Sequence, residues 1–296
     1  MTIVPTQNPA DTRGQAPTRA LRVVAVTSGK GGVGKSNLVV NLAVQFAASG
    51  RRVLVLDADL GLANCDLLMG VAAKRDLRHV LHHGATLDEC ITEGPGGVHL
   101  LSGGNGVVEL TELGSAERVR LLDVLEPTAA RYDTLLVDTG AGIGGNVRFF
   151  AGAAHEVMLV ITPEPTSLAD AYSTVKVLSG VCGVRRVLVC VNRAPDLTGA
   201  REAFSRIHTL VSRFLPVVLE FGGWIPSDTA VEDAVRSQVP FCMLHPMSPA
   251  AQRTRALAEA IVRRRPDAPG SGGLQLFWRN LILGSMGGMA AMEVAS

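Results

Sequence analysis

The chain has few aromatic residues, few cysteines and no excess of charge of either sign. Of its 296 residues, 4% are aromatic and five are cysteines. Because the cysteines are widely spaced and form no Cys-x-x-Cys pair, we expect neither a disulfide framework nor a closed zinc or iron–sulfur site. The 28 Lys and Arg residues offset 27 Asp and Glu residues, so the chain as a whole is not strongly attracted to nucleic acid or anionic lipid. We expect no specific nucleic-acid partner, although a local basic patch could still bind either polyanion.

Long hydrophobic runs are also absent. The N-terminus is polar and contains several prolines, without the apolar region of a secretory signal, and no apolar run reaches about 18 residues. Apolar residues nevertheless make up 47% of the chain and charged residues 19%, which is the composition of a globular protein. These observations predict a soluble cytoplasmic protein.

Apolar runs of the buried-strand type alternate along the chain with helical patterns. The runs occupy residues 23–26, 53–56, 98–101, 135–137, 157–161 and 187–191, and helical patterns between them include 36–49, 116–130 and 167–180. This alternation predicts an α/β fold with a mainly parallel, twisted sheet and helices on both faces. We expect a flexible tail over residues 1–20, one domain over 21–262, a linker over 263–273 and an amphipathic segment over 274–296.

A phosphate-binding loop follows the first apolar run. Its sequence, Gly29-Lys30-Gly31-Gly32-Val33-Gly34-Lys35-Ser36, fits the pattern G-x-x-x-x-G-K-[ST] between a strand and a helix. Glycines let such a loop turn tightly and aim its N–H groups at phosphate oxygens, and the start of the next helix adds a positive dipole. Lys35 would contact the β- and γ-phosphates, the Ser36 hydroxyl would bind Mg²⁺, and Asn37 would complete the nucleotide-binding residues of this segment.

Carboxylates end two of the other apolar runs. Asp57 and Asp59 lie two residues apart, so both can face the crevice at the carboxyl edge of the sheet, and Asp138 ends the run 135–137. Phosphoryl transfer needs a held Mg²⁺ and an oriented water more than covalent help. A lone Asp in such a place is often a helix cap or a turn residue. Three of them beside a phosphate loop favour a nucleotide site.

The second lysine of the loop, Lys30, points to one family. The loop resembles the deviant Walker A motif, K-G-G-x-G-K-[ST], of the MinD/ParA P-loop ATPases. The resemblance implies that Lys30 reaches the partner's nucleotide across a dimer and neutralises charge that develops during phosphoryl transfer. From the residue alone, Lys30 could also be an exposed loop lysine.

The same resemblance assigns roles to the carboxylates. It implies that Asp59 positions the attacking water, and that it acts in catalysis together with Lys30 and Lys35. Asp57 and Asp138 would hold the water shell of Mg²⁺ with Ser36. Gly140, in a stretch similar to switch II of the family, would donate its N–H to the γ-phosphate.

Two later segments indicate which base the bound nucleotide carries. The Asn-Lys-x-Asp box that selects guanine in P-loop GTPases is missing after the run 187–191, where the sequence is Asn192-Arg193-Ala194-Pro195-Asp196. This resembles the Asn-Arg element of MinD-like ATPases, in which the Asn amide meets adenine, and Ile225-Pro226-Ser227-Asp228 resembles the loop that closes over the base. The resemblance implies ATP, with contacts from Asn192, Arg193, Pro226 and Asp228. From the residues alone, the segments could also be a strand-end turn and a proline turn with a helix cap.

Three further stretches resemble the FlhG family, also called FleN or YlxH, which are MinD-like ATPases that control flagellar number and placement. They span residues 59–66, 138–143 and 162–172, and the resemblance as a whole extends over 21–262. It implies the flagellar GTPase FlhF, a flagellar transcription activator or basal-body proteins as partners. The chain departs from the family's FlhF-stimulating Asp-Gln-Ala element, because it has only Gln15-Ala16, with Leu21-Arg22 further on.

The C-terminal segment has an apolar face. At about 100° per residue, one side of a helix over residues 274–283 carries Leu274, Phe277, Trp278, Leu281 and Ile282, although Leu276 and Leu283 interrupt the other side. With the upstream cluster Arg263-Arg264-Arg265, this is typical of a helix that lies on a membrane surface. The alternative is a helix docked on the protein's own surface.

These features together predict a slow, Mg-ATP-dependent ATPase that dimerises with ATP. It would be cytoplasmic and would associate peripherally, in the presence of ATP, with the inner face of the cell membrane. The alternatives are a MinD-type division-site regulator and a ParA-type ATPase that positions DNA or cargo. A metal-cluster carrier is a third, and the cysteine spacing argues against it.

Overall fold

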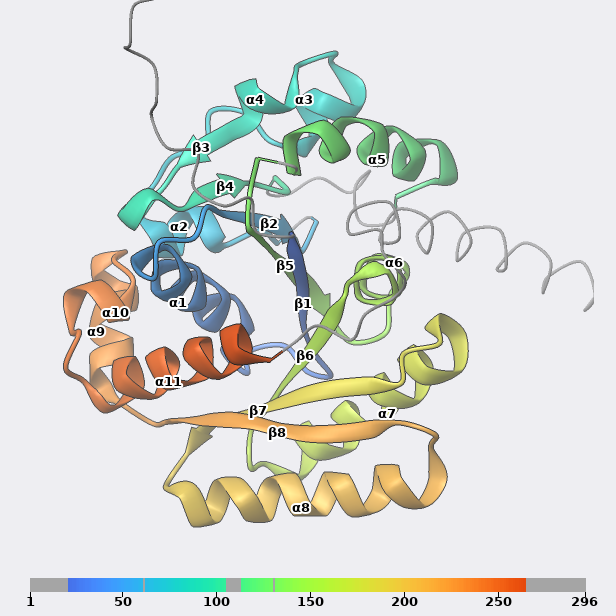
Figure 1. Cartoon of the computed structure of the whole chain (residues 1–296), viewed down its shortest axis with the longest axis vertical. Helices are drawn as coiled ribbons and strands as arrows, with labels where there is room; N and C mark the ends of the chain where they lie inside the picture. The colour runs from blue at the N-terminus through green and yellow to red at the C-terminus, as the bar shows by residue number, and fades with distance from the viewer. Residues whose placement is uncertain (1–20, 61, 105–112, 130, 265–296) are drawn as a thin grey trace, which may run out of the picture.

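A computed structural model describes residues 21–60, 62–104, 113–129 and 131–264, and its centre is an eight-stranded sheet (Figure 1). The order of strands across the sheet is β3-β4-β2-β5-β1-β6-β7-β8, and only the β3–β4 pair is antiparallel. The strands are β1 Arg22–Ser28, β2 Val53–Ala58, β3 Ile91–Glu93, β4 His99–Leu101, β5 Thr134–Ala141, β6 Glu156–Ile161, β7 Arg186–Ala194 and β8 Val218–Pro226.

Helices cover both faces of this sheet. Contacts between helices and with the sheet place α1, α2, α9, α10 and α11 on one face and α3, α5, α6, α7 and α8 on the other. The helices are α1 Lys35–Ala48, α2 Cys65–Met69, α3 Leu77–His82, α4 Leu87–Cys90, the 3₁₀ turn η1 Pro95–Gly97, α5 Ser115–Ala129, α6 Gly145–Ala153, α7 Pro165–Cys182, α8 Leu197–Phe214, α9 Thr229–Ser237, α10 Phe241–Leu244 and α11 Pro249–Arg263. The predicted α/β class and the mainly parallel sheet are confirmed.

Two hydrophobic cores explain why the central strands are continuously apolar. In β1, Val23 and Ala25 pack into the core beneath α6 and α7, while Val24 and Val26 pack into the core beneath α1 and α11. Successive strand residues point to opposite faces, so a strand covered on both sides has no polar position. The apolar runs of the sequence therefore coincide with the inner strands.

Two strands were not predicted. β8 carries Gly222 and Gly223 in its middle, which interrupt the apolar pattern, and β3 has only three residues. Ile225 and Pro226, interpreted from sequence as part of a loop, are the last two residues of β8. The predicted tail, and the linker and C-terminal segment beyond Arg264, lie outside the described residues.

A network of charged side chains joins the start of β1 to the end of α11. Arg22 donates to the carbonyl oxygens of Ile261 and Arg264, and its Nε lies 2.7 Å from Glu156. Arg264 in turn lies 2.7 Å from Glu220. The last helix is thus fixed to the amino edge of the sheet, opposite the edge that carries the phosphate loop.

Candidate functional site

The phosphate loop connects β1 to α1 at the carboxyl edge of the sheet. Gly32 and Gly34 have φ of 77° and 88°, the left-handed conformation that glycine adopts at little cost. Gly34 is the N-cap of α1, no side chain caps this end, and the first turn contains no acidic residue. The N–H groups at the start of α1 are therefore free to bind an anion in the loop.

Lys35 and Ser36 open α1 beneath the loop. Lys35 is buried and forms an ion pair with Asp138 in β5. Burial acts to lower the pKa of Lys35, but the charge and hydrogen bond of Asp138, together with the charge of Asp59, raise the pKa overall. The Lys35 Nζ also lies 3.4 Å from the Ser36 hydroxyl, so the predicted phosphate-binding and metal-binding groups are adjacent.

Sheet register places two of the carboxylates side by side. Asp57 in β2 pairs directly with Asp138 in β5, and both side chains are fully buried. Asp57 accepts hydrogen bonds from the N–H groups of Asp59, Asn64 and Cys65 at 3.2, 3.0 and 2.9 Å. Burial, together with the charge of Asp138, raises the pKa of Asp57 to about 7. Two buried carboxylates balanced by one lysine leave an excess of negative charge that favours a divalent cation.

Asp59 and Gly140 lie against each other at the mouth of this site. A Cβ atom added to Gly140 would come within 3.3 Å of the Asp59 carboxylate. Gly142 donates its N–H to Ser28 at 2.8 Å, which fixes the segment after β5 to the end of β1. Burial raises the pKa of Asp59, and Lys35 opposes that shift. The predicted switch residues therefore share one small space beside the phosphate loop.

Lys30 points away from these carboxylates. Its ammonium group lies 3.3 Å from Glu164 and 3.3 Å from the hydroxyl of Thr166, and its side chain is 43% exposed. The structure thus separates the two lysines of the loop: Lys35 is buried in its own site, and Lys30 is held at the surface beside the start of α7.

A cavity of about 670 Å³ lies next to the phosphate loop. It brings together Gly34 and Asn37 with the distant Asn192, Arg193, Pro226 and Asp228, as the sequence predicted for a base pocket. The Asn192 amide donates to the Val33 carbonyl at 2.7 Å. Ile225, from the predicted motif, gives the cavity one apolar wall. Further apolar lining comes from residues that sequence analysis had not singled out: Leu38, Val231, Val235 and Phe241. These four belong to no motif, because their spacing is that of ordinary apolar positions of helices.

Asp228 has a structural task as well. Its carboxylate accepts from Ala230 N at 3.0 Å, which caps α9, and from Ala250 N at 3.0 Å. The helix-cap interpretation is thus correct for Asp228, while the predicted contact with adenine stays a prediction.

The donor set beside Lys35 fits Mg²⁺. Ser36, Asp57 and Asp138 offer one hydroxyl and two carboxylates, and hard oxygen ligands of this kind suit Mg²⁺, which keeps several waters. Cys65, which the motif analysis did not weigh as a ligand, also lies here, with its sulfur 3.5 Å from Asp138.

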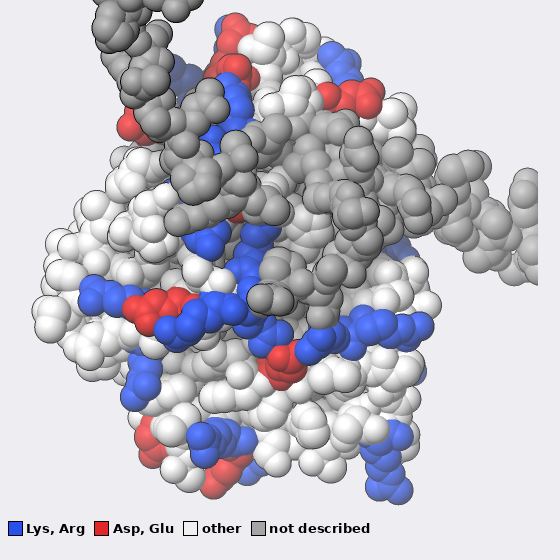
Figure 2. Space-filling model, in the orientation of Figure 1, with Lys and Arg blue, Asp and Glu red and all other residues white. Residues whose placement is uncertain are grey.

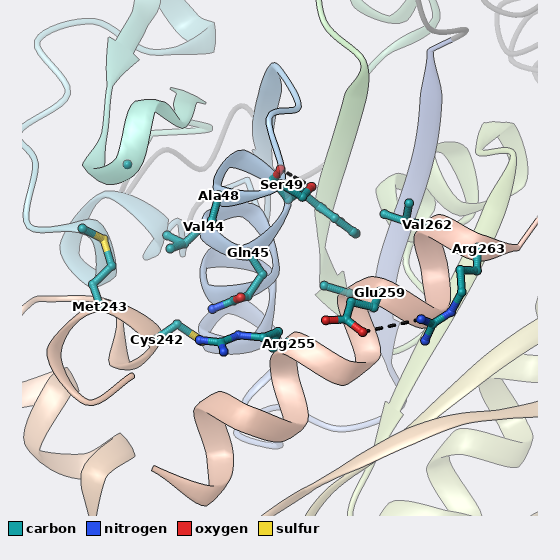
Figure 3. A pocket seen from close by; sticks show the side chains of 13 residues that line it. Val44, Gln45, Ala48, Ser49, Cys242, Met243, Arg255, Glu259, Val262 and Arg263 are labelled. Atoms are coloured by element: carbon teal, nitrogen blue, oxygen red, sulfur yellow. Dashed lines mark hydrogen bonds and ion pairs between the residues drawn. The ribbon is translucent and has the colours of Figure 1, made fainter. Parts of the chain in front are cut away.

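A second cavity, of about 610 Å³, lies at the opposite end of α1 (Figure 3). Val44, Met243 and Val262 give it apolar walls from α1, α10 and α11, and the Glu259–Arg263 ion pair borders it at 3.5 Å. About 20 Å of helix separates the two ends of α1, so this cavity is not part of the phosphate site.

Known proteins resemble the chain in both sequence and fold. A family model described as an AAA domain matches residues 21–181. The antiactivator FleN of Pseudomonas aeruginosa is 39% identical over 262 residues, which cover 88% of this chain and 94% of FleN. The flagellum site-determining protein YlxH of Helicobacter pylori is 40% identical over 158 residues, or 53% of this chain and 54% of YlxH.

Solved structures of MinD have a similar fold. The septum site-determining protein MinD of Pyrococcus horikoshii, solved in complex with Mg-ADP, superposes with a TM-score of 0.69 at 27% identity, covering 82% of this chain and 96% of MinD. The chain therefore belongs to the FlhG/FleN family of MinD/ParA-type P-loop ATPases, and its cofactors are ATP and Mg²⁺.

Proposed function

We propose that this ATPase is a switch that regulates flagellar number and placement, and that ATP drives it to form a homodimer and to associate with the membrane. The flagellar role is supported by two relatives, one named an antiactivator and the other a flagellum site-determining protein. The contrast between its two loop lysines is the observation that carries the dimer mechanism.

Within one chain, the buried groups bind and orient ATP. Lys35 exchanges its pair with Asp138 for the β- and γ-phosphates, which lie over the N–H groups at the start of α1. Asp59 orients the attacking water, and Gly140 leaves space for it beside the γ-phosphate. When bound, Mg²⁺ at Ser36, Asp57 and Asp138 neutralises charge on the phosphate oxygens.

Lys30 completes the site of a second chain. Its exposed ammonium lies beside Glu164, outside the group of Lys35 and the three carboxylates, so it is available to a surface that approaches the loop. A two-fold dimer with the two phosphate loops facing each other would carry each Lys30 to the partner's ATP. There it would neutralise developing charge in the manner of an arginine finger.

Exposed apolar side chains surround this same edge. Leu62 and Leu67 follow β2, Ile143 follows β5, and all three are exposed. A second chain that covered them would remove apolar surface from water and so stabilise the dimer. Because Leu62 and Ile143 lie three residues beyond Asp59 and Gly140, the dimer surface would respond to the state of the nucleotide.

Membrane association is assigned to the predicted segment 274–283, which lies outside the described residues. Within the described part of the chain, none of the helices has the length and hydropathy needed to cross a bilayer. By resemblance, the protein partners are FlhF, a flagellar transcription activator or basal-body proteins. A ParA-like role on DNA is less well supported, because acidic side chains lie among the Lys and Arg residues of the face in Figure 2.

The dimer is tested with Asp59→Ala, which should bind ATP without hydrolysing it. We expect light scattering to report a stable dimer of this variant with Mg-ATP and a monomer with Mg-ADP. The variant Asp66→Ala is the matched control, because Asp66 is a partly exposed carboxylate in the first turn of α2, outside the site, and it should behave as wild type. A monomeric Asp59→Ala protein at saturating ATP would contradict the mechanism.

The membrane step is tested separately by co-sedimentation with anionic liposomes. We compare the full chain with a chain that ends at Arg265, each with ATP and with ADP. The full chain should sediment only with ATP, and the shorter chain should stay in solution. Equal ATP-dependent sedimentation of both chains would remove the segment 274–283 from the mechanism, leaving the dimer untouched.

A further inference from the structure

Three potential metal ligands of mixed chemistry meet below the phosphate loop. They are the carboxylates of Asp57 and Asp138 and the thiol of Cys65, and their ligand atoms all lie within 4.8 Å of one another. In the described part of the chain this is the one such group of three, and all its members are fully buried. A thiol is an unusual neighbour for Mg²⁺, which prefers oxygen ligands.

The spacing of these atoms suits a tetrahedral ion. The Cys65 sulfur lies 3.5 Å from Oδ2 of Asp138. For a tetrahedral Zn²⁺ with bonds of about 2.3 Å to sulfur and about 2.0 Å to oxygen, the two ligand atoms are about 3.5 Å apart. All the ligand atoms lie within 4.8 Å of one another.

The surrounding structure fixes all three ligands. Asp57 and Asp138 are paired in the register of β2 and β5, and Cys65 begins α2 with its N–H bound to Asp57 at 2.9 Å. Lys35 pairs with Oδ1 of Asp138, so Oδ2 is left facing the sulfur. The ligands are therefore held in place before any ion arrives, which lowers the entropic cost of binding.

The charges of this group also match a divalent ion. The two carboxylates have one cation beside them, the ammonium group of Lys35. A divalent cation adds positive charge to a buried place where uncompensated negative charge is costly. The half-buried Asp59 at the mouth of the site gives an ion a negatively charged approach.

We propose that the nucleotide-free chain binds one thiophilic divalent cation of the Zn²⁺ class through Asp57, Cys65 and Asp138. On binding, the S–H bond of Cys65 breaks, its proton passes to solvent, and the sulfur forms a bond to the ion. A fourth position stays open for water. Because Asp57 and Asp138 are also the proposed Mg²⁺ ligands, a bound Zn²⁺ excludes Mg-ATP and holds the enzyme inactive.

Cobalt(II) is a suitable probe, since it occupies zinc sites and absorbs light. We titrate the full-length, nucleotide-free protein with Co²⁺ and expect one ion per chain, with a thiolate-to-cobalt charge-transfer band and the intense visible bands of a tetrahedral ion. Added Zn²⁺ should remove both. Cys65→Ser should lose the charge-transfer band and bind Co²⁺ at least 10-fold more weakly.

Cys190→Ser is the matched control. Cys190 is equally buried, but its pKa is raised by burial alone, with no charged group beside it. This variant should bind Co²⁺ as wild type does. A charge-transfer band that persists in Cys65→Ser, or weak octahedral absorption in the wild type, would overturn the proposal.

A measurement on the unaltered protein covers the case in which Cys65→Ser does not fold. Excess Mg²⁺ with a non-hydrolysable ATP analogue should release the bound Co²⁺ and abolish its spectrum, because both ions need the same carboxylates. A spectrum that is unchanged at saturating analogue would place the ion elsewhere and refute the site. Light scattering with Mg-ATP, free of transition metals, tests the dimer independently of this result.

Discussion

The ammonium group of Lys35 forms a buried ion pair with the carboxylate of Asp138 beneath the phosphate loop. Lys35 is the first residue of α1 and Asp138 lies within β5, so the pair joins the helix to the centre of the sheet. The ion pair also holds the Lys35 side chain beneath the phosphate loop. Under the proposed mechanism, nucleotide binding would replace one anionic partner of Lys35 by another.

Lys35→Ala should therefore damage both stability and activity. We expect the free energy of unfolding of the nucleotide-free chain to fall by about 3–5 kcal/mol, because a buried carboxylate loses its counter-ion. ATP hydrolysis should fall at least about 100-fold, because the phosphates lose a charged partner. Urea denaturation and a phosphate-release assay measure the two effects.

The double variant Lys35→Ala/Asp138→Asn is the control for Lys35→Ala. With both charges removed, the remaining buried carboxylate of the pair of strands is Asp57, which keeps its three backbone N–H donors. Much of the lost stability should therefore return while hydrolysis stays low. A single variant as stable as wild type would show that the buried pair does not form in solution.

Lys30→Ala should lower the rate of hydrolysis without lowering the stability of the fold. Its side chain is exposed and makes surface contacts with Glu164 and Thr166, so thermal stability should not change measurably. Hydrolysis should still fall at least about 100-fold, because the partner's site loses its cation.

A mixing experiment shows whether Lys30 acts across the interface. Lys30→Ala chains keep Asp59, and Asp59→Ala chains keep Lys30, so a mixed dimer has one complete site. Equal amounts mixed before ATP is added should recover about a quarter of wild-type activity, since half of the dimers are mixed and one of their two sites works. No recovery above the separate variants would mean that Lys30 acts within its own chain.

Sequence alone predicted the phosphate loop, the inner strands and the carboxylates at their ends, because local spacing and apolar runs determine these features. It did not predict the Lys35–Asp138 pair or the contact between Cys65 and Asp138. Both depend on the side-by-side register of β2 and β5 with β1, which brings together residues about 70 to 100 positions apart. Register is a property of the packed sheet rather than of any single segment.

The lining of the cavity that is the proposed base pocket was predicted only in part, for a related reason. Asn192 and Pro226 were found because they belong to short polar motifs at strand ends. The apolar wall could not be found, because residues such as Leu38 and Val231 follow the same periodicity as core residues. β8 itself was missed because Gly222 and Gly223 break its apolar run.

Gly140→Ala should slow hydrolysis with little effect on nucleotide binding. The added Cβ would come within 3.3 Å of the Asp59 carboxylate, closer than an ordinary contact, so this carboxylate must shift by a few tenths of an ångström. We expect at least about a 10-fold lower rate, because a misplaced catalytic group has a large cost. Titration with a fluorescent ATP analogue should give nearly the wild-type dissociation constant.

Gly144→Ala is the matched control for this variant. Gly144 lies nearby at the start of α6 with a φ of −60°, and an added Cβ would meet no atom within 4 Å. Its rate should stay within about two-fold of wild type. A similar loss in both variants would indicate general damage to the segment rather than a clash with Asp59.

Ionisation of Glu220 should make the free energy of unfolding depend on pH. Hydrogen bonds from Arg264 and Arg186, with the charges of both, hold the pKa of Glu220 below its usual value of 4.5. The folded pKa is thus below the unfolded one, so the ionised carboxylate stabilises the fold above about pH 4.5 and this contribution is lost as the pH falls through the folded pKa. Glu220→Gln should lower the free energy of unfolding by about 1 kcal/mol near pH 7, because the pair with Arg264 is only partly exposed.

The difference between Glu220→Gln and wild type should shrink as the pH is lowered below about 4.5, where protonation of Glu220 makes the two chains alike. Urea denaturation at a series of pH values measures it. Glu232→Gln is the control, because Glu232 pairs with Arg236 on the exposed surface of α9 and should show no measurable effect at any pH. A Glu220→Gln effect that is constant with pH would mean that packing, and not the charge of Glu220, fixes the end of α11 to the sheet.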